Sequence, residues 1–180
     1  YTGLSFWKDG KLYASTIDGR IVRFTVAADG TLSNREEVAS LHAHAKGPRL
    51  VTGFEFDPRS PVDQPIVYVP NSQLSSSPTN PTALEGAEDF SGKITRLSGP
   101  GFSKIEDVVV NLPQSYRDHC VNQPTFGPDG LLYVPMPSNT ATGGPDSFWA
   151  FRKEHLLCAT ILQINVDGLP NGKPLDVKTI

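Results

Sequence analysis

The sequence predicts an all-β protein built from the blades of a β-propeller, and three observations support this fold class. Glycine and proline number 16 each in 180 residues, which exceeds average usage and favours many turns. Short segments in which residues alternate in polarity recur along the chain, as in β-strands with one buried face. About three units of four such segments follow one another in the same order, which is typical of antiparallel propeller blades. The alternative is a β-sandwich in which the recurrence is accidental.

The first unit is expected over residues 1–41. Its first strand ends at Phe6, and the tight turn KDG leads into a second strand that contains LYA. The third strand, GRIVRFTV, alternates, so that Ile21, Arg23 and Thr25 face one way. A Gly-containing turn then leads to a fourth strand.

Two further units are expected over residues 50–112 and 122–180. Their first strands end at Phe56 and Phe126, and their second strands contain IVYV and LLYV. The segments GKITRL and ATILQINV give the third strands. The last unit is incomplete, because the chain reaches only DVKTI, which we expect to begin a fourth strand.

Three blades do not close a ring. A blade buries both faces against neighbouring blades, so three blades leave two apolar flanks bare. The chain also begins at Tyr1 inside an expected strand, and we interpret it as a mature or excised piece. We expect the remaining blades to come from the same longer polypeptide or from a partner chain.

The connections between strands predict where function lies. Antiparallel strands place alternate connections at opposite ends, so the long connections share one face of the molecule. They are residues 42–50, 71–91, 114–121 and 135–158. Long loops on a rigid scaffold often carry binding and catalytic residues.

Composition excludes several classes of function. The net charge is −3 and Lys and Arg are scattered, so no basic stripe indicates nucleic-acid binding. No apolar run approaches the ~18 residues of a membrane span. Cys120 and Cys158 are too few for a disulfide scaffold; they could pair once in an oxidising compartment or both remain thiols.

His119 is the leading candidate for chemistry, because an imidazole exchanges a proton near neutral pH. It stands beside Arg117 and Asp118, just before the first strand of the third unit. The alternative is a loop histidine that is hydrogen-bonded to backbone.

Metal binding is considered at two places, and no metal ligand is assigned at either. His42 and His44 could offer two imidazoles, but no third ligand is evident and a solvated loop is favoured. Glu85, Glu88 and Asp89 could offer oxygens to calcium, but EF-hand spacing is absent and a surface loop is favoured.

The connection over residues 135–158 carries aromatic and charged side chains. Phe148, Trp149 and Phe151 either pack on the blades or form one wall of a ligand cleft. Arg152 and His155 are expected to face water.

One stretch of the chain resembles a known family. YRDHCVNQPTFGPDGLLYV, followed by ATILQINVDG, resembles the soluble glucose and sorbosone dehydrogenases, and TGFEFDP, IVYVP and GKITRL are similar to the family's preceding blade. The similarity covers nearly the whole chain but about half of a family domain. It implies a six-bladed propeller that uses pyrroloquinoline quinone (PQQ) and calcium, and a secreted protein of the extracellular space or periplasm.

The resemblance also implies roles for particular residues. His119 matches the general base, Asp118 matches a substrate-contacting position, and Arg49 is a looser match to another. The family has a carboxylate that orients the catalytic histidine, where this chain has Ser138 followed by Asn139. A neutral side chain would hold the imidazole without the help of a carboxylate. The family's PQQ clamps and main calcium ligands lie beyond this chain, so its cofactor-binding residues stay unknown.

These observations predict part of a PQQ-dependent dehydrogenase for an aldose or sorbosone-type sugar, with His119 as general base during hydride transfer to the quinone. NTATGGPDSFWAFRKEHLL is more similar to the sorbosone branch of the family. The alternative is a non-catalytic propeller module that binds carbohydrate or protein through its loop face. A third interpretation is a structural domain of a larger secreted protein.

Overall fold

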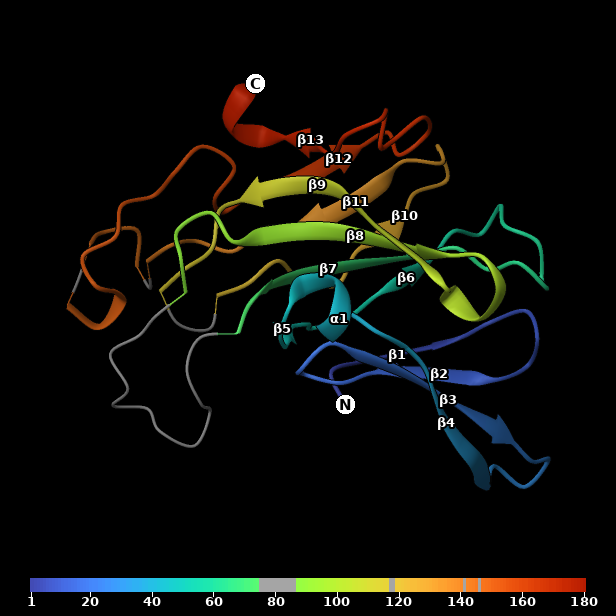
Figure 1. The fold of residues 1–180 in the computed structure, drawn as a ribbon. Helices are drawn as coiled ribbons and strands as arrows, with labels where there is room; N and C mark the ends of the chain where they lie inside the picture. The colour runs from blue at the N-terminus through green and yellow to red at the C-terminus, as the bar shows by residue number, and fades with distance from the viewer. Residues whose placement is uncertain (75–86, 117–118, 141, 146) are drawn as a thin grey trace.

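The computed structural model describes residues 1–74, 87–116, 119–140, 142–145 and 147–180. Within these ranges the chain is almost entirely strands and turns (Figure 1). The exceptions are the single-turn helices α1 (His42–Ala45), η1 (Pro100–Phe102), η2 (Ser147–Trp149) and η3 (Val177–Thr179). None of the helices in the described part has the length and apolar composition needed to cross a membrane.

The first sheet contains four antiparallel strands in sequence order. They are β1 (Gly3–Phe6), β2 (Leu12–Ser15), β3 (Arg20–Val26) and β4 (Leu32–Ser40). The turn between β1 and β2 is made by Asp9, whose carboxylate accepts the Lys11 N–H at 3.0 Å, and by Gly10 with φ of 77°. This is the conformation that an Asp-Gly pair favours in a hairpin.

The second sheet repeats this meander. Its strands are β6 (Glu55–Phe56), β7 (Val67–Gln73), β8 (Gly92–Ser98) and β9 (Lys104–Leu112), and β5 (Arg49–Leu50) pairs with the far end of β7. The third sheet contains β10 (Thr125–Phe126), β11 (Leu132–Pro135) and β12 (Ile161–Ile164).

The end of the chain differs from the prediction. We expected DVKTI to begin a fourth strand of the third unit, but β13 (Leu175–Asp176) instead pairs in parallel with β9 of the second sheet. The outer edge of β9 offers unpaired backbone groups, and Asn111 Nδ2 donates to Asp176 Oδ1 at 2.7 Å to hold the added strand there.

The three sheets pack face to face in sequence. One apolar cluster lies between the first and second sheets and another between the second and third. The same aromatic pair occurs at both junctions: Tyr13 of β2 meets Phe56 with ring centroids 5.0 Å apart, and Tyr68 of β7 meets Phe126 at 5.7 Å. At both junctions the second-strand tyrosine therefore contacts the aromatic that ends the next sheet's first strand.

The first strands converge at their starts. A Cβ on Gly3 would lie 2.7 Å from Gly53 Cα, and a Cβ on Gly53 would lie 2.5 Å from Gln123 Cβ. These three residues stand at equivalent places before or at the start of β1, β6 and β10. The sheets thus fan out from a common line, which confirms the all-β propeller and excludes two stacked sheets.

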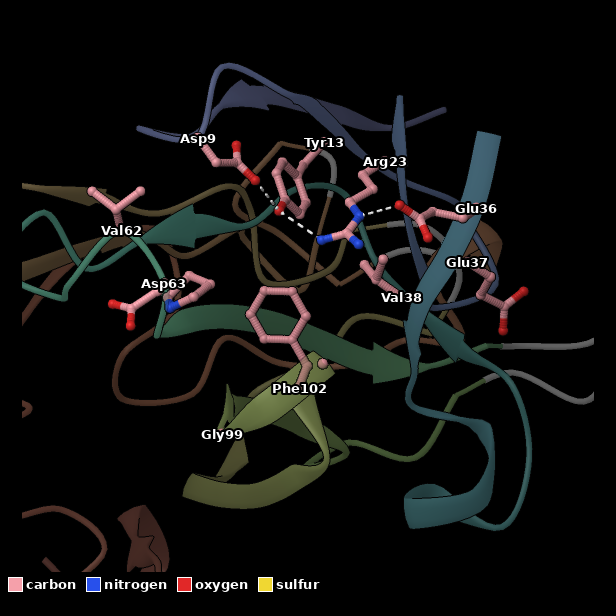
Figure 2. A pocket seen from close by; sticks show the side chains of 12 residues that line it. Asp9, Tyr13, Arg23, Glu36, Glu37, Val38, Val62, Asp63, Gly99 and Phe102 are labelled. Carbon is pink, nitrogen blue, oxygen red and sulfur yellow. Dashed lines mark hydrogen bonds and ion pairs between the residues drawn. The ribbon is translucent and has the colours of Figure 1, made fainter. Parts of the chain in front are cut away.

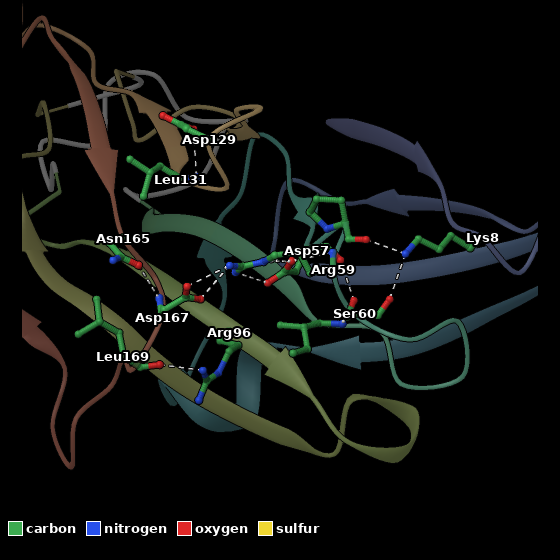
Figure 3. A network of polar contacts seen from close by, with 12 residues as sticks. Lys8, Asp57, Arg59, Ser60, Arg96, Asp129, Leu131, Asn165, Asp167 and Leu169 are labelled. Atoms are coloured by element: carbon green, nitrogen blue, oxygen red, sulfur yellow. Dashed lines mark hydrogen bonds and ion pairs between the residues drawn. The ribbon is translucent and has the colours of Figure 1, made fainter.

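The turns at the opposite end are joined by side chains (Figure 3). Lys8, in the β1–β2 turn, donates to the carbonyl oxygens of Pro58 at 2.6 Å and Ser60 at 3.1 Å. Arg59 in that second turn reaches Asp167 beyond β12 at 2.9 Å. One set of polar contacts therefore links all three sheets.

The described parts of the connections after β7, β9 and β11 meet on one face, at the left of Figure 1. Arg152, from the connection after β11, donates to the carbonyl oxygens of Gln114 at 3.0 Å and of Ala87. Ala87 N–H in turn donates to the Tyr116 carbonyl at 3.0 Å. Three connections are thereby held against one another.

Candidate functional site

His119 lies in the connection between β9 and β10, and its backbone is fixed within a short loop. Its N–H donates to Ser115 Oγ at 2.9 Å, and Ser115 N–H donates to the His119 carbonyl at 3.1 Å. The residue is half-buried. The sequence thus places the imidazole on the loop face with a fixed main chain behind it.

Two contacts fix the imidazole ring. Nδ1 lies 3.1 Å from the Ser138 carbonyl oxygen. A carbonyl can only accept, so Nδ1 carries the proton, and the lone pair of the neutral ring is on Nε2. The Trp149 ring lies against the imidazole, with centroids 4.3 Å apart and a 33° angle between the planes. The contact with Trp149 makes this aromatic part of the site.

Ser138 supports the imidazole through its main chain and not through its side chain. The Ser138 hydroxyl donates to the Thr140 carbonyl. Asn139 is fully buried, and its Nδ2 donates to the Lys153 carbonyl at 3.1 Å. The sequence located the right residues but not the atom, because a residue pattern does not say which main-chain groups turn toward a neighbouring loop.

Glu154 holds this loop, and the sequence analysis did not identify it. Oε2 accepts the Asn139 N–H at 2.8 Å, and Oε1 accepts the Thr140 N–H at 3.1 Å and the Thr140 hydroxyl at 2.8 Å. Desolvation raises the pKa of the Glu154 carboxyl, but the hydrogen bonds from Asn139 and Thr140 outweigh it, so the pKa lies below its ordinary value. A lone glutamate 15 residues from its partner gives no local sequence signal.

The two cysteines are separate, buried thiols. Burial, followed by the nearby Glu154 carboxylate, raises the pKa of Cys158 to about 11. Cys158 therefore stays protonated at neutral pH. The pairing that the sequence left open does not occur in this structure.

Arg49 lies at the end of the second sheet. Its Nε donates to Asn71 Oδ1 at 2.8 Å and its Nη2 to the Ser91 carbonyl at 2.5 Å. Burial lowers the pKa of Arg49, and the negative charge of Asp107 opposes this effect. None of its hydrogen bonds within the described ranges reaches the His119 loop, and its substrate-binding role stays a prediction.

The other substrate-binding candidate, Asp118, lies outside the described residues, as do its neighbour Arg117 and the possible calcium ligand Glu85.

The histidines of α1 have different partners. His42 Nε2 contacts the Asp18 carbonyl at 2.7 Å, whereas His44 Nε2 contacts Asp107 Oδ1 at 3.1 Å. Across the described ranges, no three His, Cys, Asp or Glu side chains are grouped so that they could hold a metal ion.

Two side chains expected to face water are instead paired. Asp89 Oδ1 forms an ion pair with Arg152 Nε at 3.2 Å, and Asp89 Oδ2 is hydrogen-bonded to His155 Nε2 at 3.0 Å. The expectation for Arg152 and His155 was wrong, because their acidic partner comes from a connection about 60 residues earlier in the chain. Asp89 is thereby engaged by basic side chains.

A cavity of about 600 Å³ lies at the other end of the molecule, between the first and second sheets (Figure 2). Tyr13 donates to Asp9 Oδ2 at 2.9 Å there, Arg23 pairs with Glu36, and Phe102 faces them. Its lining comes from the turn end of the sheets, so it is separate from the His119 site.

Comparisons with known proteins support the fold. The model for the family described as strictosidine synthase-like, N-terminal, matches residues 3–24, which cover β1 to most of β3. No curated protein matches the chain. A crystal structure from Thermus thermophilus, of a protein described as a putative oxidoreductase (glucose dehydrogenase), matches with a TM-score of 0.57 and 24% identity.

That match covers 93% of this chain and 44% of the Thermus protein. The chain thus spans less than half the length of the solved structure it matches. The match agrees with the resemblance found in the sequence, and at this identity it shows the shared fold alone.

Proposed function

We propose that this chain is part of a PQQ-dependent sugar dehydrogenase that oxidises an aldose or sorbosone-type sugar, with His119 as general base. The observation that supports this most is the ring geometry of His119. Its Nδ1–H is directed to the Ser138 carbonyl at 3.1 Å, which leaves the Nε2 lone pair as the basic atom. The similarity of fold to a protein described as a glucose dehydrogenase is consistent with it.

The proposed chemistry divides a proton and a hydride between two acceptors. Nε2 of His119 takes the proton of the sugar hydroxyl as the hydrogen on the same carbon leaves as hydride, so that a carbonyl forms. The resemblance names PQQ, with calcium, as the hydride acceptor. The Trp149 ring and the Ser138 carbonyl hold the imidazole during the proton transfer.

This chain supplies no residues that we assign to PQQ or calcium. Its described residues contain no grouped metal ligands, and Arg152, a described basic side chain near the His119 loop, is already paired with Asp89. We propose that the cofactor ligands belong to further blades.

The flanks of the three sheets support the presence of such blades. Phe6 ends β1 as Phe56 ends β6, yet it is 63% exposed and no preceding tyrosine covers it in the described chain. At the other flank, Tyr133 of β11 stands where Tyr13 and Tyr68 stand in their sheets. We propose that further blades of one longer, secreted polypeptide cover both flanks, in line with the length of the Thermus protein.

The test is an assay of the complete natural polypeptide. With PQQ and calcium added, we expect dye-linked oxidation of an aldose or of sorbosone, and a change in the absorbance of PQQ. His119→Ala should lower kcat at least ~100-fold, because general-base catalysis contributes about 10²–10⁴-fold. His44→Ala, which changes a histidine bonded to Asp107, is the matched control and should keep its rate.

Two outcomes would contradict the proposal. One is no turnover with any sugar and no change in PQQ absorbance. The other is equal activity of His119→Ala and the unaltered protein.

A binding module is the second candidate, and it is favoured by the absence of a carboxylate at position 138, where a serine hydroxyl turns to Thr140. In that case His119→Ala would lower the affinity for carbohydrate or protein, measured by calorimetry. A catalytic role predicts loss of rate with affinity retained.

A further inference from the structure

We propose that Glu154 acts on His119 through the peptide group between Ser138 and Asn139, and thereby takes the place of a carboxylate bonded directly to the imidazole. Glu154 is then a positioning residue. The effect of Glu154 on catalysis rests on the proposed function. The hydrogen bonds that connect Glu154 to His119 do not depend on that proposal.

The relay consists of two hydrogen bonds on one peptide group. Glu154 Oε2 accepts the Asn139 N–H at 2.8 Å, and the Ser138 carbonyl accepts His119 Nδ1–H at 3.1 Å. That N–H and that carbonyl belong to the same planar unit. In a trans peptide they point in opposite directions, so the carboxylate and the imidazole bind opposite sides of the unit.

Peptide resonance couples the two bonds. A carboxylate that accepts from the N–H favours the resonance form with negative charge on the carbonyl oxygen. The carbonyl is then a stronger acceptor for Nδ1–H, as in chains of hydrogen bonds that strengthen one another by ~10–30% per bond. Part of the effect of a negative charge thus reaches the imidazole although position 138 is a serine.

The carboxylate is held in place and stays charged. Thr140 donates both its N–H and its hydroxyl to Oε1. These bonds keep the pKa of Glu154 below its ordinary value, so the relay is ionised at neutral pH.

Two other described charged side chains near the loop have a partner of their own. Arg152 and His155 are paired with Asp89. Arg117 and Asp118 adjoin His119 in sequence and lie outside the described residues. Trp149, on the ring's face, is uncharged. Within the described residues, Glu154 is the carboxylate that is connected to Nδ1 by hydrogen bonds.

The alternative is that Glu154 only anchors the loop. Two variants separate the roles. Glu154→Gln keeps the size and one acceptor oxygen but removes the charge, whereas Thr140→Val removes a hydroxyl bond from the same carboxylate and leaves the charge. If Glu154 acts as a relay, only Glu154→Gln should change the hydrogen bond of His119 Nδ1–H. If Glu154 only anchors the loop, both variants should change it.

The test is nuclear magnetic resonance of the complete protein with ¹⁵N-labelled histidine. We expect a hydrogen-bonded Nδ1–H resonance for His119 that moves upfield in Glu154→Gln and stays in Thr140→Val. An unchanged resonance in Glu154→Gln, or an equal shift in both variants, would overturn the relay.

A second measurement needs no variant and so does not depend on one folding. Acid titration of the unaltered protein should move the Asn139 amide resonance and the His119 Nδ1–H resonance with a common midpoint, below the ordinary range for glutamate. Separate midpoints would contradict the coupling.

Activity distinguishes this inference from the proposed function. If the protein is a dehydrogenase, Glu154→Gln should lower kcat about tenfold with KM unchanged. If the Asn139 amide and His119 Nδ1–H resonances move together but the protein has no turnover, the relay is supported and the dehydrogenase is rejected. If the protein turns over sugar but these resonances move independently, the dehydrogenase is supported and the relay is rejected.

Discussion

At the scale of single residues, the protein keeps carboxylates ionised with adjacent hydrogen-bond donors. Asp57 is 5% exposed, and its two oxygens accept the N–H, Nε and Nη2 of Arg59, each at 2.9 Å (Figure 3). Burial raises the pKa of Asp57, but the bonds from Arg59 outweigh it, and the pKa lies below its ordinary value. The same balance governs Glu154 at the candidate site.

The Asp57–Arg59 pair predicts a dependence of stability on pH. Because the folded-state pKa of Asp57 is depressed, its stabilisation is present at neutral pH and is lost as the pH falls below about 4, through the folded-state pKa. Arg59→Met should lower the free energy of unfolding by about 2 kcal/mol at pH 7, since the buried carboxylate loses both guanidinium donors and keeps only the main-chain N–H of residue 59. Urea denaturation should show this difference narrowing as the pH falls toward about 3.

The matched control is Asp167→Asn, at the exposed end of Arg59. It should change stability by less than about 1 kcal/mol. If the loss of unfolding free energy in Arg59→Met were the same at pH 7 and at about pH 3, the Asp57–Arg59 pair would not contribute in the way described.

At the scale of elements, the convergence of the first strands depends on small residues. Gly53 lies where a Cβ would meet Gln123 Cβ at 2.5 Å, a distance that forces the backbone or the side chain to move. Gly53→Ala should therefore cost roughly 1–3 kcal/mol, the range for overpacking.

Thermal unfolding tests this prediction with a rescue. Gly53→Ala combined with Gln123→Ser removes the Gln123 Cγ and Oε1 contacts, which lie at 2.7 and 2.8 Å, and should recover part of the loss. Gly144→Ala, where nothing lies within 4 Å, should leave the transition temperature unchanged. Equal transition temperatures for all three variants would contradict the close approach.

The sequence predicted the elements whose signal is local. Phe6, Phe56 and Phe126 do end the first strands, and the turns with Asp-Gly pairs do join hairpins. It placed DVKTI wrongly: Asp176 ends β13 on the edge of the second sheet, and Val177–Thr179 form η3, because strand composition does not say which edge is free. It missed Glu154, and it assigned Ser138 without its carbonyl, because both depend on how two loops meet in space.

At the scale of the whole molecule, the tyrosine–phenylalanine contacts define a rule for adding sheets. Tyr13 meets Phe56 and Tyr68 meets Phe126, so an additional sheet before the first should place a tyrosine on Phe6. In the complete polypeptide, Phe6→Ala should then cost about 3 kcal/mol, as for a buried phenylalanine. In the 180-residue chain alone, where Phe6 is 63% exposed, it should cost less than about 0.5 kcal/mol.

Denaturant unfolding of both lengths measures this difference, with Leu156→Ala as the control because Leu156 is 87% exposed. A small effect of Phe6→Ala in the complete polypeptide would mean that no sheet covers this flank.

Arg152 gives the loop face a property of its own. One guanidinium binds the carbonyls of Ala87 and Gln114, pairs with Asp89, and lies 5.2 Å from the centre of the Tyr116 ring. Loop segments that are distant in sequence are therefore joined at one side chain. A substitution that displaces one of these segments should displace the others as well. Selection for a new ligand would have to alter these loops together, so that they evolve as one block.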